Sequence, residues 1–111
     1  MRNFYTVVLE RMKRYSQDFD TEPYECGWAS EAMFFIRIHE LNDKEVILNS
    51  RVQVSVDGIQ WIDEGTAFPP MEREGDSFIK VAHFGGWLRL RNEVGGNKPD
   101  VKLTIHLVLK E

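Results

Sequence analysis

Apolar and polar residues alternate over most of the chain, and a period of two is the pattern of a β-strand with one buried and one exposed face. The clearest run lies near the C-terminus, where every second residue from Val101 to Leu109 is apolar and Val108 is the one apolar residue on the polar side. The same alternation predicts strands over residues 5–11, 34–39, 51–56, 59–63 and 88–91. No segment has a convincing helical pattern.

Turn residues separate these runs at intervals typical of a sandwich or barrel. Asp57-Gly58 supplies the positive φ angles of a tight hairpin between residues 51–56 and 59–63. That hairpin predicts that Val56 faces the core and that Trp61 covers the buried side of the sheet. Roughly eight short strands fit the chain length. We therefore expect an all-β, antiparallel β-sandwich that is jelly-roll-like, with an immunoglobulin-like strand order as the alternative.

The composition is that of one folded domain spanning residues 1–111, with 42% hydrophobic and 29% charged residues. The formal net charge of -4 argues against nucleic-acid binding. Cys26 is the only cysteine, so no internal disulfide can form. The N-terminal sequence MRNFYTVVLERMKRY has no long apolar run, and no stretch is long enough to span a bilayer. We expect a cytoplasmic or virion chain that does not enter a membrane and is not secreted through a signal peptide.

One hairpin and one later strand resemble a known class of module. The stretch Ser55-Val56-Asp57-Gly58-Ile59-Gln60-Trp61 is similar to the Ser-x-Asp-Gly-x-x-Trp hairpin of discoidin-type, galactose-binding-like sandwich modules. In these modules a later strand carries an aromatic residue before an Arg-x-Arg alternation, and residues 84–91, FGGWLRLR, are similar. The hairpin also resembles that of small sandwich proteins of tailed-phage particles. The resemblance covers about half of the chain and implies a sandwich fold. The short length and single cysteine depart from the discoidin pattern, so no ligand-binding residue is carried over.

Two groups of residues are candidates for metal binding. His39 and His106 share the polar faces of their predicted strands, so pairing of these strands would bring them together as the metal site of a small enzyme. Solvated sheet histidines are the preferred interpretation for both and for His83. Asp18, Asp20 and Glu22 alternate like the start of a calcium loop, but the glycine and the bidentate glutamate of that loop are missing. We interpret the segment as an acidic surface loop, with loose calcium binding as the alternative, and we expect no metal site and no cofactor.

Apart from the two histidines, no motif in the sequence indicates a catalytic site. Cys26 lies beside Gly27 and Trp28 without a basic neighbour, which is typical of a small buried residue rather than a nucleophile. The chain has no Gly-x-Ser-x-Gly elbow and no phosphate-binding Gly-rich loop. We therefore expect a protein that is not an enzyme.

Charged residues are distributed unevenly along the predicted strands. Basic residues occupy outward positions, namely Arg37, Arg51, Lys80, Arg89, Arg91 and Lys102. Acidic residues cluster in one early segment, namely Asp18, Asp20, Glu22, Glu25 and Glu31. The acidic segment of one copy can therefore meet the basic sheet face of the next, and a solvated face with compensating charges is the alternative. Trp87 shares the polar face with these arginines, and tryptophan beside arginine is the composition of an interface hot spot.

Two functional hypotheses follow, beside the weaker one of a metal-dependent enzyme that uses His39 and His106. The first is a non-enzymatic structural or assembly protein that forms homo-oligomers or decorates a larger particle such as a virion. Its contacts would come from Trp87, Arg89, Arg91 and the acidic segment of residues 18–25. The second is a carbohydrate-binding module that stacks a sugar ring on Trp28 or Trp87, with loop carboxylates accepting hydrogen bonds from the hydroxyls.

Overall fold

Residues 4–82 and 84–111 are described by the computed structural model, and their regular structure consists of nine β-strands. The strands in chain order are β1 (Phe4–Tyr15), β2 (Phe19–Asp20), β3 (Tyr24–Glu25), β4 (Glu31–Leu41), β5 (Ile47–Ser55), β6 (Ile62–Ala67), β7 (Gly75–Ala82), β8 (Trp87–Gly95) and β9 (Val101–Lys110). Within the described ranges no helix is long and apolar enough to cross a membrane. The predicted all-β class is confirmed.

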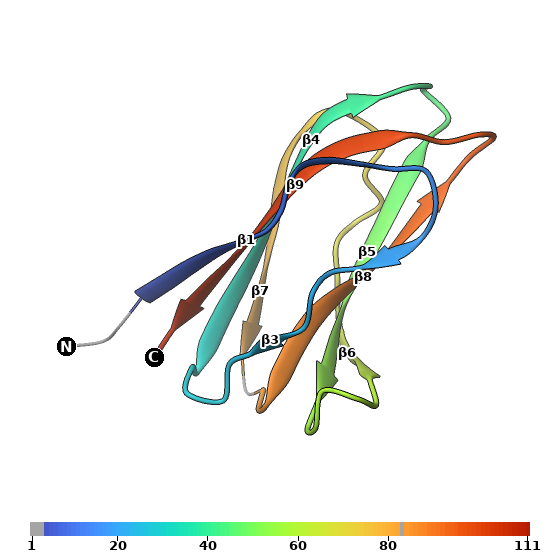
Figure 1. Ribbon diagram of the computed structural model, residues 1–111. Coiled ribbons are helices and arrows are strands. Elements are labelled where there is room, and N and C mark those ends of the chain that lie inside the picture. Colours follow the sequence, from blue (N-terminus) through green and yellow to red (C-terminus); the bar gives the residue numbers. More distant parts are fainter. Residues whose placement is uncertain (1–3, 83) are drawn as a thin grey trace.

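The strands build two antiparallel sheets that pack as a sandwich (Figure 1). Sheet A has the order β1-β9-β4-β7, and sheet B has the order β2-β8-β5-β6 with β3 also paired to β8. The pairs β1·β9, β2·β8, β3·β8, β4·β7 and β5·β6 are those of one long antiparallel hairpin rolled up around the β5–β6 turn. That arrangement is a jelly roll. The predicted topology is confirmed, and the immunoglobulin-like alternative is excluded.

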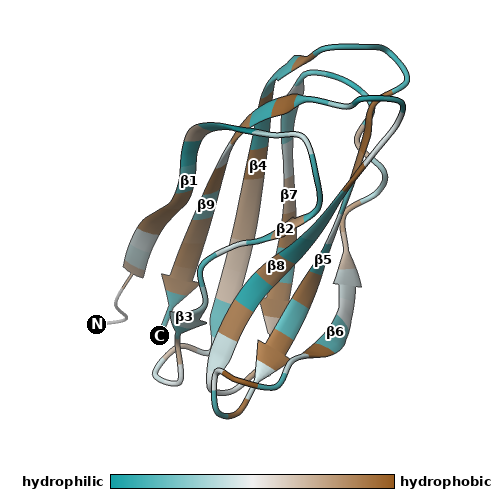
Figure 2. Ribbon diagram, turned by 45° about the vertical axis from the view of Figure 1, so that its right-hand side comes forward, coloured by the Kyte–Doolittle hydropathy of each residue, from teal (hydrophilic) through white to brown (hydrophobic). Residues whose placement is uncertain are grey.

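The core lies between the sheets and consists of the inward-facing rows of the strands. Every second residue of β9 from Val101 to Leu109 is 0% exposed, as the alternation predicts. Leu88 and Leu90 approach these residues from β8 of the opposite sheet and are equally buried. Figure 2 shows the corresponding bands of hydrophobic and hydrophilic residues along β5 and β8. Burial of each such aliphatic side chain stabilises the fold by about 1.5–3 kcal/mol.

A buried amide attaches the short strand β2 to sheet B. Asn92 is 0% exposed, and its Nδ2 donates hydrogen bonds to the carbonyls of Phe19 and Leu90 at 3.3 and 3.2 Å. Its Oδ1 accepts a hydrogen bond from Ser50 Oγ at 2.6 Å. Thr21 adds a backbone bond from its N–H to the Leu90 carbonyl at 3.0 Å. Because a buried polar group must be satisfied, these bonds hold the segment around β2 against β8.

The hairpin between β5 and β6 is wider than the predicted tight turn. Its loop comprises residues 56–61, so β6 begins at Ile62 and not at Ile59. Gly58 has the expected positive φ of 78°. Asp57 Oδ1 accepts hydrogen bonds from the N–H groups of Ile59 and Gln60 at 2.9 and 3.1 Å, which stabilises the wider loop. Val56 is 92% exposed on this loop, so its predicted core position is wrong because the strand ends one residue earlier.

Trp61 also lies elsewhere than predicted. It is half-buried just before β6, and the guanidinium carbon of Arg89 is 4.3 Å from its ring centroid. Arg89 alternates with the buried Leu88 and Leu90, so it projects from the outer face of sheet B. Trp61 therefore packs on the outside of the sheet and not over the core. The width of the loop sets the register of the second arm, and the register decides which face the ring covers.

Candidate functional site

Charged side chains on the outer face of sheet B form ion pairs across neighbouring strands. Arg51 of β5 donates from Nε to Asp63 Oδ1 of β6 at 3.1 Å and pairs on its other side with Glu93 of β8. Gln53 donates to the same Asp63 oxygen at 3.0 Å. The hydrogen bond from Gln53 and, to a lesser extent, that from Arg51 hold the pKa of Asp63 below its ordinary value. The charges of this part of the face are therefore compensated within the chain.

The acidic segment around β2 and the arginines of β8 pair in the same way. Asp20 lies 3.6 Å from Arg89 and 3.4 Å from Arg91, and Asp18 lies 3.6 Å from Arg91. Asp18 also accepts a hydrogen bond from the N–H of Val94 at 2.9 Å. The acidic and basic groups that the sequence assigned to different copies thus meet in one chain, because the buried hydrogen bonds of β2 hold this segment on β8. Contact of these residues with a partner stays a prediction.

The remaining residues of the predicted interface lie around the start of β8. Glu25 of β3 is opposite Trp87, and Glu25 Oε1 accepts a hydrogen bond from the Gly27 N–H at 2.9 Å. Trp87 is half-buried, whereas Trp28, in the loop between β3 and β4, is 43% exposed. Glu22 is exposed between β2 and β3. Trp28 is therefore the more accessible of the two rings predicted to bind a sugar.

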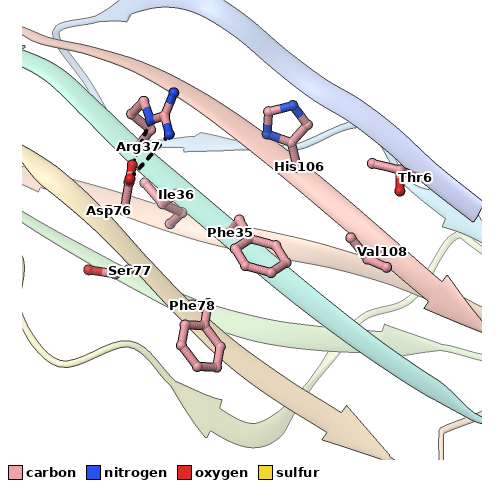
Figure 3. A pocket seen from close by; sticks show the side chains of 9 residues that line it. All are labelled: Thr6, Phe35, Ile36, Arg37, Asp76, Ser77, Phe78, His106 and Val108. Carbon is pink, nitrogen blue, oxygen red and sulfur yellow. Dashed lines mark hydrogen bonds and ion pairs between the residues drawn. The ribbon is translucent and has the colours of Figure 1, made fainter.

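The outer face of sheet A has an apolar, hollowed patch between its charged residues. Phe35 of β4 and Phe78 of β7 stack with ring centroids 5.7 Å apart and an angle of 30° between the rings. Together with His106 and Val108 of β9 and Thr6 of β1, they line a groove of about 410 Å³ (Figure 3). Phe78 is 55% exposed. The groove thus presents aromatic rings to the surroundings.

Charged groups border this groove. Arg37 donates from Nε to Asp76 Oδ1 at 2.6 Å (Figure 3), and this bond lowers the pKa of Asp76. A second hollow of about 280 Å³ adjoins the groove, and its lining includes Met33, Lys80 and Val108. Because Val108 belongs to both hollows, the apolar surface continues along β9. We call the residues that line either of the two hollows the sheet A surface.

The two histidines proposed for metal binding lie on this same side of sheet A. His39 Nε2 lies 2.8 Å from Thr104 Oγ1, and His106 is opposite Phe35 in the groove. Among residues 4–82 and 84–111, no three His, Cys, Asp or Glu side chains gather as metal ligands. No third metal ligand from this part of the chain therefore joins His39 and His106, as the alternative of a metal enzyme would need. His83 lies outside the described residues.

Cys26 has the position predicted for a small buried residue. It is 0% exposed, and its Sγ lies 3.4 Å from the carbonyl oxygen of Gly86. Burial, with the nearby Glu25 carboxylate as a second cause, raises the pKa of the thiol to about 12. The thiolate, which is the reactive form, is therefore strongly disfavoured at neutral pH.

The sheet A surface was not among the predicted contact surfaces, although the alternation of the strands contains a signal for it. Val108 is apolar on the polar side of its strand, and Phe35 lies between the buried residues Phe34 and Ile36. Both positions break the alternation in the same way, because a polar residue is expected there. Only the pairing of β4 with β9 places the two side chains on one surface.

Comparisons with known proteins extend the description of the fold. No protein-family model and no curated protein matches the sequence. The structure is similar to that of the SPBc2 prophage-derived protein YomS, with a TM-score of 0.64, 8% identity and coverage of 100% of this chain and 96% of that chain. It is similar to a chain of infectious bursal disease virus Gx strain, with a TM-score of 0.59, 9% identity and coverage of 98% and 32%. It is also similar to the CBM36-1 domain of a multidomain xylanase from the hindgut metagenome of Trinervitermes trinervoides, with a TM-score of 0.52, 13% identity and coverage of 96% of both chains. These likenesses establish the sandwich fold.

Proposed function

We propose that this chain is a non-enzymatic structural protein that assembles through the sheet A surface, with copies of itself or onto a larger particle such as a virion. The contrast between the two outer faces carries the proposal. Sheet B pairs its charges within the chain, whereas sheet A exposes stacked aromatic rings around a groove. We thus propose the same assembly function that the sequence predicted, but with sheet A and not sheet B as the main contact surface.

Exposed apolar residues on sheet A supply the energy for such a contact. Phe78 is 55% exposed, Phe4 68% and Val8 37%. A cluster of apolar side chains with a charged border is typical of a protein–protein contact, and aromatic anchors usually dominate its binding energy. Two sheet faces pack against each other at a spacing of about 10 Å, which excludes water from the rings between them. Burial of these rings therefore favours assembly.

The structural neighbours support a role in a particle. One neighbour is described as prophage-derived, and another belongs to a virus structure. Jelly rolls are common in viral capsids. The resemblance of the Ser55–Trp61 hairpin to sandwich proteins of tailed-phage particles favours the same function.

The proposed function is tested by the solution mass of the protein over a concentration and salt series, measured by light scattering. We expect an oligomer that persists at high salt, because burial of apolar surface and not ion pairing holds it together. Phe78→Lys should lower the mass. Ile59→Lys is the matched control, because Ile59 is 79% exposed but lies in the β5–β6 loop.

Two results would contradict this function. The first is an oligomer that dissociates in high salt and whose mass is unchanged by Phe78→Lys. This result would indicate that the contact is made by the charged residues of sheet B. A strict monomer that also fails to bind purified particles from the same source would remove the assembly function.

A second function, carbohydrate binding, is favoured by the exposure of Trp28. Its ring is 43% exposed, and one neighbour is a CBM36-1 domain of a xylanase. Stacking of a sugar ring on an exposed tryptophan is a common mode of recognition because both surfaces have apolar faces. Calorimetric titration with xylan and galactan fragments tests it, with Trp28→Ala as the variant. Binding that survives Trp28→Ala, or no binding at all, would argue against this site.

A further inference from the structure

Strand β1 is an edge of sheet A. It pairs with β9 along one side and with no other strand of the described chain (Figure 1). An edge strand presents unpaired N–H and C=O groups, and another strand can add to them. Proteins usually block such edges with charged side chains, bulges or prolines. The position of these blocking features therefore indicates where an added strand is tolerated.

The second half of β1 is blocked. Its register with β9 shifts twice, between Val8 and Glu10 and between Glu10 and Lys13. Met12 has a positive φ of 47°, and its N–H donates a hydrogen bond to Thr104 Oγ1 at 3.0 Å. Basic side chains of the same half are exposed, namely Arg11, Lys13 and Arg14. A regular partner strand cannot continue past these bulges and charges.

The first half of β1 is open. Residues 4–8, FYTVV, contain no charged residue and no proline, and they pair with residues 106–110 of β9 without a register shift. Phe4 is 68% exposed, Tyr5 53% and Val8 37%. The other edge of sheet A, β7, differs because it carries the exposed charges of Asp76 and Lys80. Of the two described edges of sheet A, β1 therefore has the unblocked apolar stretch, in its first half.

This stretch is complementary to itself in the antiparallel direction. With Thr6 opposite Thr6 of a second copy, Phe4 is opposite Val8 and Tyr5 is opposite Val7. Aromatic residues opposite β-branched residues and threonine opposite threonine are favourable cross-strand pairs, each contributing about 0.2–1 kcal/mol. We propose that residues 4–8 of two copies pair antiparallel about a two-fold axis at Thr6, which joins two four-stranded sheets into one. The proposal deepens the assembly function and rests on it.

Charge favours the register centred on Thr6, and continuity of the sheet A surface favours a second copy as the partner. A register centred on Met12 would put Arg11 of one copy opposite Lys13 of the other, so like charges disfavour it, whereas the register centred on Thr6 pairs residues 4–8 without any charged residue. Thr6 also lines the groove of sheet A together with Val108, its partner in β9. Pairing of two β1 strands would therefore make the sheet A surfaces of both copies continuous.

A cysteine placed on the two-fold axis tests the pairing. Thr6→Cys should form a disulfide-linked dimer under mild oxidation at least about tenfold faster than Ile59→Cys, whose side chain is exposed in the β5–β6 loop. Cys26 does not interfere because it is 0% exposed. Circular dichroism and the melting temperature verify that both variants are folded.

A second variant keeps the test independent of disulfide geometry. Thr6→Lys places like charges opposite each other, so the dissociation constant of the dimer should rise by about tenfold or more, measured by light scattering. Equal cross-linking of the two cysteine variants together with an unchanged dimer in Thr6→Lys would overturn strand pairing. The assembly function then stands if Phe78→Lys still lowers the mass. A wild-type chain that is monomeric at every concentration and binds no particle would overturn both proposals.

Discussion

The guanidinium carbon of Arg89 lies 4.3 Å from the centroid of the Trp61 ring, on the outer face of sheet B. Arg89 Nε donates a hydrogen bond to Gln53 Oε1 at 2.8 Å, which fixes the guanidinium over the ring. We expect Trp61→Ala to lower the free energy of unfolding by about 1–2 kcal/mol, from the cation–π contact and partial burial. Leu90→Ala in the core should cost about 2–5 kcal/mol. Urea denaturation compares the two, and equal losses would contradict the outer position of Trp61.

Two adjacent glycines before β8 should respond differently to substitution. Gly86 has a φ of 79°, and a Cβ there would lie 2.5 Å from the carbonyl oxygen of Ser55. Gly86→Ala should therefore cost about 2–5 kcal/mol, from a left-handed alanine and a clash with the backbone. At Gly85 a Cβ would have no atom within 4 Å, so Gly85→Ala should change stability by less than about 1 kcal/mol. Thermal unfolding measures both, and the reverse order would show that this turn has another conformation.

The thiol of Cys26 should be unreactive in the folded protein. It is 0% exposed, and its pKa is raised to about 12, so both access and thiolate formation are suppressed. We expect no reaction with a thiol reagent near about pH 8 and full reaction of this single thiol in denaturant. Ile59→Cys supplies an exposed thiol as the control, because Ile59 is 79% exposed. Rapid labelling of the folded wild type would contradict the buried position.

Stability should fall in acid because several carboxylates have lowered pKa values in the fold. Asp57 is stabilised as an anion by the N–H groups of Ile59 and then Gln60, and Asp76 by Arg37, so both folded pKa values lie below the ordinary 3.8. The unfolded chain therefore binds these protons first as the pH falls. The stabilisation is complete above about pH 4 and is lost as the pH falls through the folded pKa values.

Substitution of Asp57 tests the origin of this pH dependence. Asp57→Asn keeps a side-chain oxygen for the loop but cannot titrate, so its free energy of unfolding should change less between about pH 5 and pH 2 than that of the wild type. Urea denaturation at a series of pH values measures both slopes. Identical slopes would show that Asp57 does not contribute to the acid sensitivity.

Local pattern in the sequence was sufficient for the sandwich and for β1, β4, β5, β8 and β9, but it did not predict β2, β3 or β7. The row from Val101 to Leu109 is buried as the alternation predicts, and Cys26 is buried as its neighbours indicate. Even the jelly-roll order follows the expectation. The buried rows are predictable because side chains on a strand alternate strictly, so the pattern of one segment shows which residues share a buried face.

Only the tertiary structure determined which charged side chains are paired within the chain and which apolar side chains form an exposed surface. Asp18 meets Arg91 because β2 pairs with β8, and Trp61 lies outside sheet B because a wide loop sets the register of β6. Phe35 and Val108 form one apolar surface because β4 lies beside β9. The side on which a residue lies is a local property of its strand, whereas the partners on that side depend on pairing and register between segments far apart in the chain. That long-range information is absent from the local alternation of any single strand.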